Sequence, residues 1–585
     1  MKYVWIGLLL AIGSSACSPR DKHQKHSIVR IRWVRDPENL SPLVQPNQNA
    51  VDALTLLHCS LLQLDFSTGI HVPALADSLP NVHLVGDSLT EISYQLRRAA
   101  TWDSGRPVLA SDVAFTLKLY QCPGLPNENA RGQLSFIRDI RLNPGNSRRF
   151  TLVCRGQAPE FRLETGDFPV LPEATLDAKH TLRRYSLAQL ANLTSLPPRD
   201  TALTALVSRY QHADPSHHPE RLPGCGAYRL QAWEIDRFLT FVRKPHWWAD
   251  TLRPTPFVLQ ARPRQITYLI IPDETTAALA LRRHELDVLP QLSARAFKRL
   301  QAADSTQQEL SFYSIASYEL LMAGFNTSRP MLHDSLTRQA LAQLFDPAKL
   351  QKATQLGQGL RTVGLVHPSN RSYYNDSLAL PAYNPKQAVF LLQQAGWQRQ
   401  AAGWVSAKAK NKAQQAPLKL RLRYRADDQV FATVALQFKS AATALGIPVA
   451  LLPTEASSLT TALQEGDFDI YVRKLSTSPF AFDFSMLLHS RTIPKSNFTK
   501  FSTRTTDRLM DAIAATGAPA QKRKLLRRFQ TIIQQQAPFV PLFFLPYRLA
   551  TARELQHVHP SGYKPGYYAA AATWNIASST VAAAQ

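Results

Sequence analysis

Serine, histidine and acidic residues could carry out hydrolysis or hold a metal, but their spacing in this 585-residue chain fits neither chemistry. No Gly-x-Ser-x-Gly, His-Glu-x-x-His or Ser-x-x-Lys motif occurs in the structural context that its chemistry needs. Three histidines, His212, His217 and His218, lie in a proline-rich stretch, and there is no Cys-x-x-Cys pair. We therefore expect no catalysis, no metal site and no cofactor.

Four cysteines lie beyond the first seventeen residues, at Cys59, Cys122, Cys154 and Cys225. An even number of cysteines in an oxidising compartment allows disulfides, and three pairings exist. Cys122 with Cys154 is the pair to test first. The alternative is four small buried hydrophobic residues, because a chain of this size does not need disulfides to be stable.

The first seventeen residues have the pattern of a secretory signal. One positive charge at Lys2 precedes the apolar stretch from Tyr3 to Ile12, and small residues lead up to Cys17. The stretch is too short to span a bilayer stably. Small residues before a cysteine resemble the lipobox of bacterial lipoproteins, which implies cleavage and acylation at Cys17; an ordinary signal peptide is the alternative. We expect an extracytoplasmic protein anchored in the lipid bilayer through acylated Cys17, with residues 18–27 as a polar tether.

Amino-acid composition restricts the classes of protein to which the chain could belong. The hydrophobic content of 45% indicates a globular chain, and the single long apolar run at the N-terminus excludes a polytopic membrane protein. Lys plus Arg number 67 against 43 Asp plus Glu, for a net charge of +24, or +23 once Lys2 is removed with the signal. No nucleic-acid motif or long basic tail accompanies the charge, so we expect no nucleic-acid partner. Attraction to anionic lipid headgroups or a plainly basic surface remain as explanations.

The elements that must position any ligand are of the α/β type. A predicted strand at 28–34 leads into a polar loop at 39–49 and a helix at 51–62. Residues 266–292 and 417–453 each read as a strand, a helix and a second strand, which is typical of parallel sheets. Between the first helix and residue 120 the pattern is α+β. The sequence therefore predicts two α/β lobes and an additional α+β subdomain.

Five motifs, in this order, resemble the solute-binding lipoproteins of ABC importers that take up oligopeptides, dipeptides and nickel complexes. They are Asp-x-x-Thr-Gly-x-x-x-Pro-x-Leu-Ala at Asp65 to Ala76; Trp102 to Pro107 with Ala110 to Thr116; Gly226-Ala227-Tyr228 leading to Trp247-Trp248; Phe325-Asn326 with Arg338 to Leu341 and Phe345-Asp346; and Tyr383-Asn384-Pro385 leading to Leu391 to Trp397. Each motif is weak alone, and together they extend over most of the chain. Trp102 and Asp103 match a turn of the family's scaffold.

The resemblance implies a fold like that of periplasmic binding proteins, with two lobes joined by a hinge. Lobe I would comprise 28–60, 200–312 and 545–576, the inserted subdomain 61–199, and lobe II 313–544, with 577–585 as a tail. Two strands would cross between the lobes near Tyr313 to Leu321 and Pro541 to Leu549. Such a receptor closes on its ligand, and contacts that improve on closure drive the motion.

The resemblance also indicates where ligand contacts should lie. Family members contact ligand from the loop after the first strand and from the crossings between lobes. The corresponding candidates here are Gln45, Asn47, Gln48, Tyr318, Asn326 and Tyr547. Each has a structural alternative, as a solvated turn or a packed side chain.

In peptide-binding members, an Asp after the Phe-Asp strand pairs with the peptide α-amine. Here the strand is 468–472, and the expected position falls near Ser478, so this amine clamp is absent. Asp483 could replace it if the loop is displaced. Arg473 and Lys474 make an anionic ligand equally conceivable, unless both point to solvent. We predict that ordinary free-amine tripeptides bind poorly.

The sequence thus predicts a monomeric solute receptor that captures a peptide-like or other polar solute and delivers it to an ABC permease and its ATPase. One alternative is a receptor that signals ligand occupancy or chaperones exported chains without transport. An extracytoplasmic hydrolase is the less favoured alternative.

Overall fold

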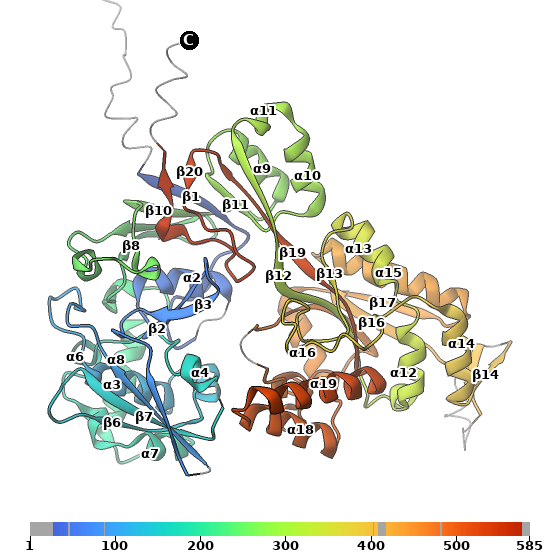
Figure 1. Ribbon diagram of the computed structural model, residues 1–585, viewed down its shortest axis with the longest axis horizontal. Helices are drawn as coiled ribbons and strands as arrows, with labels where there is room; N and C mark the ends of the chain where they lie inside the picture. Colours follow the sequence, from blue (N-terminus) through green and yellow to red (C-terminus); the bar gives the residue numbers. More distant parts are fainter. Residues whose placement is uncertain are drawn as a thin grey trace, which may run out of the picture.

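The computed structural model describes residues 27–44, 47–86, 88–158, 160–401, 403–407, 417–479 and 482–575. The predicted signal with Cys17, nearly all of the tether, Gln45 and the tail at 577–585 lie outside these residues. Figure 1 shows two lobes side by side, joined by a pair of long strands. No helix in the described part of the chain is long and apolar enough to cross a membrane.

Lobe I is built on one end of a large sheet. Its strands β1 (Ile28–Trp33), β8 (Tyr228–Glu234), β9 (Phe238–Arg243), β10 (Gln265–Ile270) and β11 (Val288–Pro290) follow the order β11-β1-β10-β9-β8. Strand β1 runs parallel to β10 and β11, as strand-helix-strand connections require. Helices α9 (Glu274–Arg282) and α10 (Ala294–Ala302) pack on this sheet with β11 and β12 (Leu310–Phe325). Asp273 caps α9.

The predicted inserted subdomain contains a separate sheet. Its order is β4-β5-β7-β6, formed by β4 (Asn81–Val85), β5 (Leu89–Gln95), β6 (Ile137–Leu142) and β7 (Arg149–Arg155). The hairpin β2 (Leu62–Asp65) and β3 (Ile70–Pro73) precedes it. Its helices are α3 (Ala110–Gln121), α4 (Glu128–Gln133), α5 (Phe161–Glu164), α6 (Glu173–Leu176) and α7 (Leu187–Asn192). One continuous hydrophobic core includes both this segment and lobe I, so the two are packed as one body.

Lobe II carries the other end of the large sheet, in the order β17-β16-β18-β12-β19, where β19 spans Phe539–Ala552. Strands β16 (Leu420–Arg425), β17 (Val449–Thr454) and β18 (Ile470–Ser476) are parallel, with β18 antiparallel to β12. One core joins the sheet to α12 (Ser335–Ala342), α13 (Pro347–Gln355), α14 (Pro385–Gln394) and α15 (Gln429–Ala444). A second core joins it to α16 (Ala456–Glu465), α18 (Arg504–Ala515) and α19 (Pro519–Gln536). Helix α19 begins at Pro519, and Gly446, with a positive φ, follows the end of α15.

The two halves of the sheet meet at β12 (Leu310–Phe325) and β19 (Phe539–Ala552), which pair antiparallel along most of their length. Their register shifts between Ala316 and Leu320, so that three residues of β12 lie opposite Leu545 alone. These strands include both predicted crossings. The α/β fold of two lobes joined by crossing strands is therefore confirmed.

Ser111, a residue type typical of N-caps, does not cap α3: the helix begins at Ala110, and the Asp112 carboxylate accepts the backbone N–H of Leu109 instead. Of the two interpretations of the cysteines, the structure agrees with four small buried residues: Cys122 and Cys154, the pair to test first, are free thiols, as are Cys59 and Cys225. Burial raises the pKa of the Cys122 and Cys154 thiols to about 12, as expected of small core residues.

Candidate functional site

A bulge in β12 marks the point where the chain passes between the lobes. Ser317, Tyr318 and Glu319 have no ladder partner on β19. The Ser317 hydroxyl donates to the carbonyl of Leu545 at 2.7 Å, and its oxygen accepts the N–H of Glu319 at 3.2 Å. A bulge re-aims the side chains that follow it, and here it turns Tyr318 and Glu319 out of the ladder.

These two side chains meet the C-terminal loop of lobe I, and we call this set of interactions the crossing contact. The rings of Tyr318 and Tyr563 stack with centroids 4.9 Å apart, and Glu319 pairs with Lys564 at 2.8 Å. The loop approaches closely, since a Cβ on Gly562 would lie 2.1 Å from the carbonyl oxygen of Ala316. Lys564 is 40% exposed, so solvent screens this ion pair.

Two cavities lie along α2 (Gln48–Leu57), immediately behind the crossing contact. One has a volume of about 260 Å³ and lies between α2 and α4, and the other, of about 190 Å³, reaches Lys564. Both are lined by Val51, Thr55, Cys59, Gln63 and Asp167, so they adjoin. The smaller cavity adds aromatic walls from Phe66, Tyr228, Trp247, Tyr268, Tyr567 and Tyr568. Apolar walls with a few polar groups are typical of small-molecule sites.

Asp52 is the principal polar group of the smaller cavity. Burial raises the pKa of its carboxyl from 3.8 to about 7, although the Gln48 amide, which donates to it at 2.8 Å, and the nearby Lys564 ammonium act in the opposite direction. Burial also lowers the pKa of His58, in the larger cavity, to about 3, so that imidazole is neutral. Among the lining residues, Asp52 and Asp167 carry the acidic groups and Lys564 the only ammonium. These walls favour a ligand that donates hydrogen bonds.

Several predicted residues come together here. Gln48 lines the smaller cavity, and Tyr318 belongs to the crossing contact. Tyr547 lies beneath the same loop, where its hydroxyl donates to the carbonyl of Pro565 at 2.5 Å. Ser478 follows Thr477, whose N–H donates to the Tyr318 carbonyl at 2.8 Å, so this segment also reaches the crossing.

Two predicted residues have structural roles instead. Asn47 is the N-cap of α2: its amide oxygen accepts the N–H of Ala50, and its amide nitrogen donates to Pro37. Asn326 is fully buried in lobe II, where its amide nitrogen donates to the carbonyls of Gly466 and Phe468. Neither side chain retains a group directed at a ligand.

Arg473 and Lys474 do not act as a pair, because neighbouring residues of β18 point to opposite faces of the sheet. Lys474 pairs with Asp428 at 2.7 Å on the α15 side. The Arg473 guanidinium lies 5.4 Å from the Phe498 ring centroid on the other side. A joint anion site at this strand end is therefore not formed.

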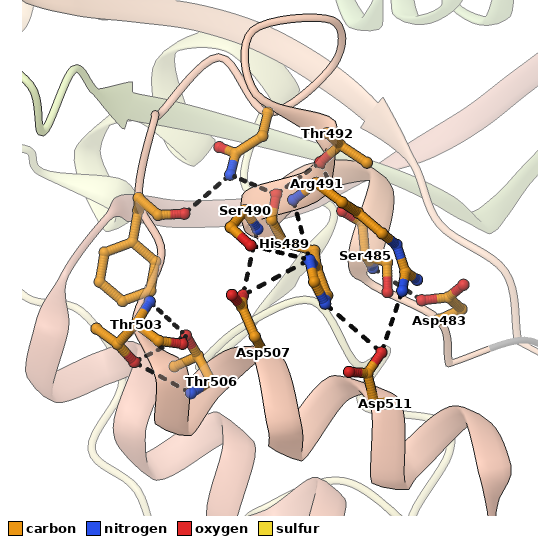
Figure 2. A network of polar contacts seen from close by, with 12 residues as sticks. Asp483, Ser485, His489, Ser490, Arg491, Thr492, Thr503, Thr506, Asp507 and Asp511 are labelled. Carbon is orange, nitrogen blue, oxygen red and sulfur yellow. Dashed lines mark hydrogen bonds and ion pairs between the residues drawn. The ribbon is translucent and has the colours of Figure 1, made fainter.

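Asp483 lies at the start of a well-braced segment of lobe II. Its carboxylate accepts the N–H of Ser485 at 2.8 Å, at the start of α17 (Ser485–Leu488). Figure 2 shows how α18 supports this segment from below. Asp507 and Asp511 of α18 lie 3.7 and 3.5 Å from the two ring nitrogens of His489, and Asp511 also pairs with Arg491 at 3.1 Å.

A second interaction between the lobes lies away from the crossing strands, and we call it the distal contact. The Lys522 ammonium of α19 pairs with Glu160, just before α5 in the inserted subdomain. Both side chains are largely buried, at 5% and 13% exposed. Burial and the nearby Glu160 and Asp483 carboxylates raise the pKa of Glu164 to about 7, while Lys522 opposes that shift. Asp483 thus faces this contact rather than a ligand amine.

Sequence reasoning missed Asp52, Lys564 and the tyrosines of the C-terminal loop. Asp52 could have been noticed as a lone acid among the apolar residues of α2. The loop could have been noticed as a run of glycine, proline and aromatic residues at 562–568. Within the described residues, no three His, Cys, Asp or Glu side chains are arranged to hold a metal.

Comparison with known proteins gives the family. The family "Bacterial extracellular solute-binding proteins, family 5 Middle" matches residues 71–495. The nickel-binding periplasmic protein of Escherichia coli (strain K12) is 23% identical over 57% of this chain, and the match spans 62% of that relative, less than two thirds of its length. The probable D,D-dipeptide-binding periplasmic protein of the same organism is 20% identical over 89% of each chain.

Solved structures share the fold. The oligopeptide-binding protein AppA from Bacillus subtilis, in complex with a nonapeptide, superposes with a TM-score of 0.73 at 16% identity, covering 94% of this chain and 99% of that one. NikA from Brucella suis, in complex with Fe(III)-EDTA, gives 0.70 at 18% identity, covering 94% and 100%. Because the family match extends over most of the chain, this protein belongs to family 5 of the bacterial extracellular solute-binding proteins.

Proposed function

We propose that this protein is the lipid-anchored receptor of an ABC importer, and that it holds a polar, peptide-like solute in the cavities along α2 and delivers it to the permease. The observation that carries the proposal is the position of the smaller cavity. Asp52 lines its wall and Lys564 lies at its edge, and Lys564 also pairs with the crossing strand. A ligand bound there is therefore coupled to the contact between lobes.

The chemistry of the walls restricts the solute. Asp52 and Asp167 accept hydrogen bonds, while Gln48 and Gln63 can donate or accept them. Aromatic rings supply apolar surface around these groups. We infer a ligand with several hydrogen-bond donors and some apolar surface. Relatives of this chain include a nickel-binding periplasmic protein and a dipeptide-binding protein of Escherichia coli.

Native mass spectrometry of the purified protein tests the proposal, because ligands held in partly enclosed cavities often survive purification. We expect a bound mass in the range of a small peptide or chelate in the wild-type spectrum. That mass should be lost in the Asp52→Leu variant and kept in an Asp511→Leu variant, which changes an exposed acid of α18. Equal retention by both variants would place the ligand elsewhere.

Calorimetry with a mixed tripeptide library tests the ligand class. The position near Ser478 lacks the acid that pairs with a peptide amine, so we expect weak binding of free-amine tripeptides. Sub-micromolar binding would contradict this expectation and make Asp52 the first candidate for the amine partner. Intact mass spectrometry of the protein from membranes, which detects acyl chains at Cys17, tests the anchor separately.

A further inference from the structure

The chain enters lobe I at an edge that is rich in unpaired cations. Strand β1 starts at Ile28, and the N–H of Arg264 donates to the carbonyl of Ser27 at 2.9 Å. Because α9 and α10 follow strands parallel to β1 and run back toward its start, their C-terminal ends lie at this same edge. Figure 1 shows α9, α10 and α11 (Asp304–Gln307) together at one end of lobe I, near β1 and β20 (Leu555–Gln556).

Six exposed basic residues occupy this edge, and we call them the basic edge. They are Arg262, Arg264, Arg282, Arg283, Lys298 and Arg299. Within the described residues none of the six makes an ion pair. Three exposed carboxylates lie nearby, at Glu285, Asp304 and Glu309, and Glu309 is opposed by His284 at 3.8 Å. Cations therefore outnumber acids here.

We infer that the basic edge binds the anionic headgroups of the bilayer in which the protein is anchored. This inference rests on the proposed function for its anchor, because the residues from Ser18 to Ser27 then join the edge to the membrane. At roughly 3.5 Å per residue, ten residues hold the edge within about 35 Å of the bilayer. Each basic side chain near an anionic surface gains about 1 kcal/mol of attraction at most, so several must act together.

The geometry favours a membrane over a nucleic acid. The cations lie around the point where the described chain begins, which is the point that the anchor would bring to the bilayer. Electrostatic attraction decays over about 10 Å at moderate salt, so only the surface nearest the membrane is affected. Helices α18 and α19, which also carry exposed cations, lie at the far end of the molecule in Figure 1.

Vesicle co-sedimentation of the non-acylated mature chain, residues 18–585, tests the edge without the anchor. We expect binding to vesicles containing phosphatidylglycerol and none to pure phosphatidylcholine. Replacing Arg282, Arg283, Lys298 and Arg299 with Glu should reduce binding by about tenfold or more. The matched control replaces four exposed cations of α18 and α19 with Glu, at Arg504, Arg523, Lys524 and Arg528, and should change binding by less than about threefold.

A milder second variant, with Arg262→Gln and Arg264→Gln, should give an intermediate loss and guards against misfolding of the first. Equal losses in the edge and control variants, or no vesicle binding by the wild type, would overturn the inference. Tighter binding to duplex DNA than to vesicles, lost in the same edge variant, would also overturn it. Vesicle binding in a protein whose Cys17 proves to carry no acyl chain would refute the proposed anchor and leave the basic edge standing.

Discussion

Two of the contacts between the lobes differ in burial. The crossing contact uses stacked rings and a partly exposed ion pair, beside strands that already join the lobes covalently. The distal contact uses a buried lysine with a buried carboxylate. An exposed pair adds little stability, whereas a buried charge that loses its partner is strongly unfavourable. The distal contact should therefore control how far the lobes close.

The largest effect is expected from Lys522→Met. The change leaves the buried Glu160 carboxylate unpaired beside Glu164 and Asp483, so it should disfavour the closed arrangement by about 3 kcal/mol. Small-angle X-ray scattering should show a larger radius of gyration. Lys524→Met, an exposed position on the same helix, is the control and should leave the scattering unchanged. Identical curves for both variants would mean that the distal contact does not hold the lobes.

The second effect is a pH dependence of closure. Burial, Glu160 of the same subdomain and Asp483 of lobe II raise the pKa of Glu164 from its ordinary 4.5 to about 7, and the part of this shift that depends on lobe II is lost when the lobes part. A raised pKa means that the closed state binds an additional proton between these values, so closure is favoured at low pH and weakens as pH rises toward 7. Fluorescence energy transfer between dyes on the two lobes should show this trend, with a total change of about 2 kcal/mol.

Glu164→Gln should flatten that titration while keeping the contact closed. A titration that persists in Glu164→Gln would show that another group is responsible. The control is Arg162→Gln, a substitution at an exposed residue two positions before Glu164, which should leave the titration unchanged.

A third, smaller effect concerns Asp52, behind the crossing contact. Its pKa is raised from 3.8 to about 7 in the folded protein, so its ionisation lowers stability progressively as pH rises from about 4 to 7. Asp52→Asn removes this penalty and should stabilise the ligand-free protein by about 1 to 2 kcal/mol above neutral pH. Thermal unfolding of the wild type and the variant at pH 5 and pH 8 measures this difference in stability. A variant that is no more stable at pH 8 than the wild type would contradict the assignment.

The smallest effect is expected at the crossing contact itself. Glu319→Gln removes an ion pair whose lysine is 40% exposed, so closure should change by only about 0.5 kcal/mol. The same fluorescence measurement used for Glu164 applies. A change as large as that of Lys522→Met would reverse the ranking of the two contacts.

The overall architecture could be read from the sequence because it depends on local patterns. Strand-helix-strand segments, the Asp273 cap and the Pro519 helix start are short-range signals, and the family motifs fixed their order. The crossing strands were located through the resemblance to the family, which places one crossing on each side of lobe II. Side-chain direction was less accessible: the alternation along β18 separates Arg473 from Lys474, which a list of neighbouring residues does not reveal.

The site depended on contacts between residues that are distant in sequence. Asp52 and Lys564 come together only once the C-terminal loop folds back onto α2. Glu160 and Lys522 lie in different lobes. Asn47 and Asn326 were predicted as ligand contacts, but both make hydrogen bonds to nearby backbone. Polar residues next to loops are as often helix caps or backbone partners as ligand contacts, and the sequence alone does not distinguish these roles.

The three residues of β12 that have no partner on β19 have a mechanical consequence. The ladder with β19 is regular up to Ala316, and after the three residues it shifts once more between Leu321 and Met322, so torsion between the lobes should concentrate in the segment from Ser317 to Met322. Two of these pivot residues also form the stop against which the loop carrying Tyr563 and Lys564 comes to rest. Pivot and stop therefore cannot be tuned independently: a substitution that alters the swing of the lobes also alters where the swing ends.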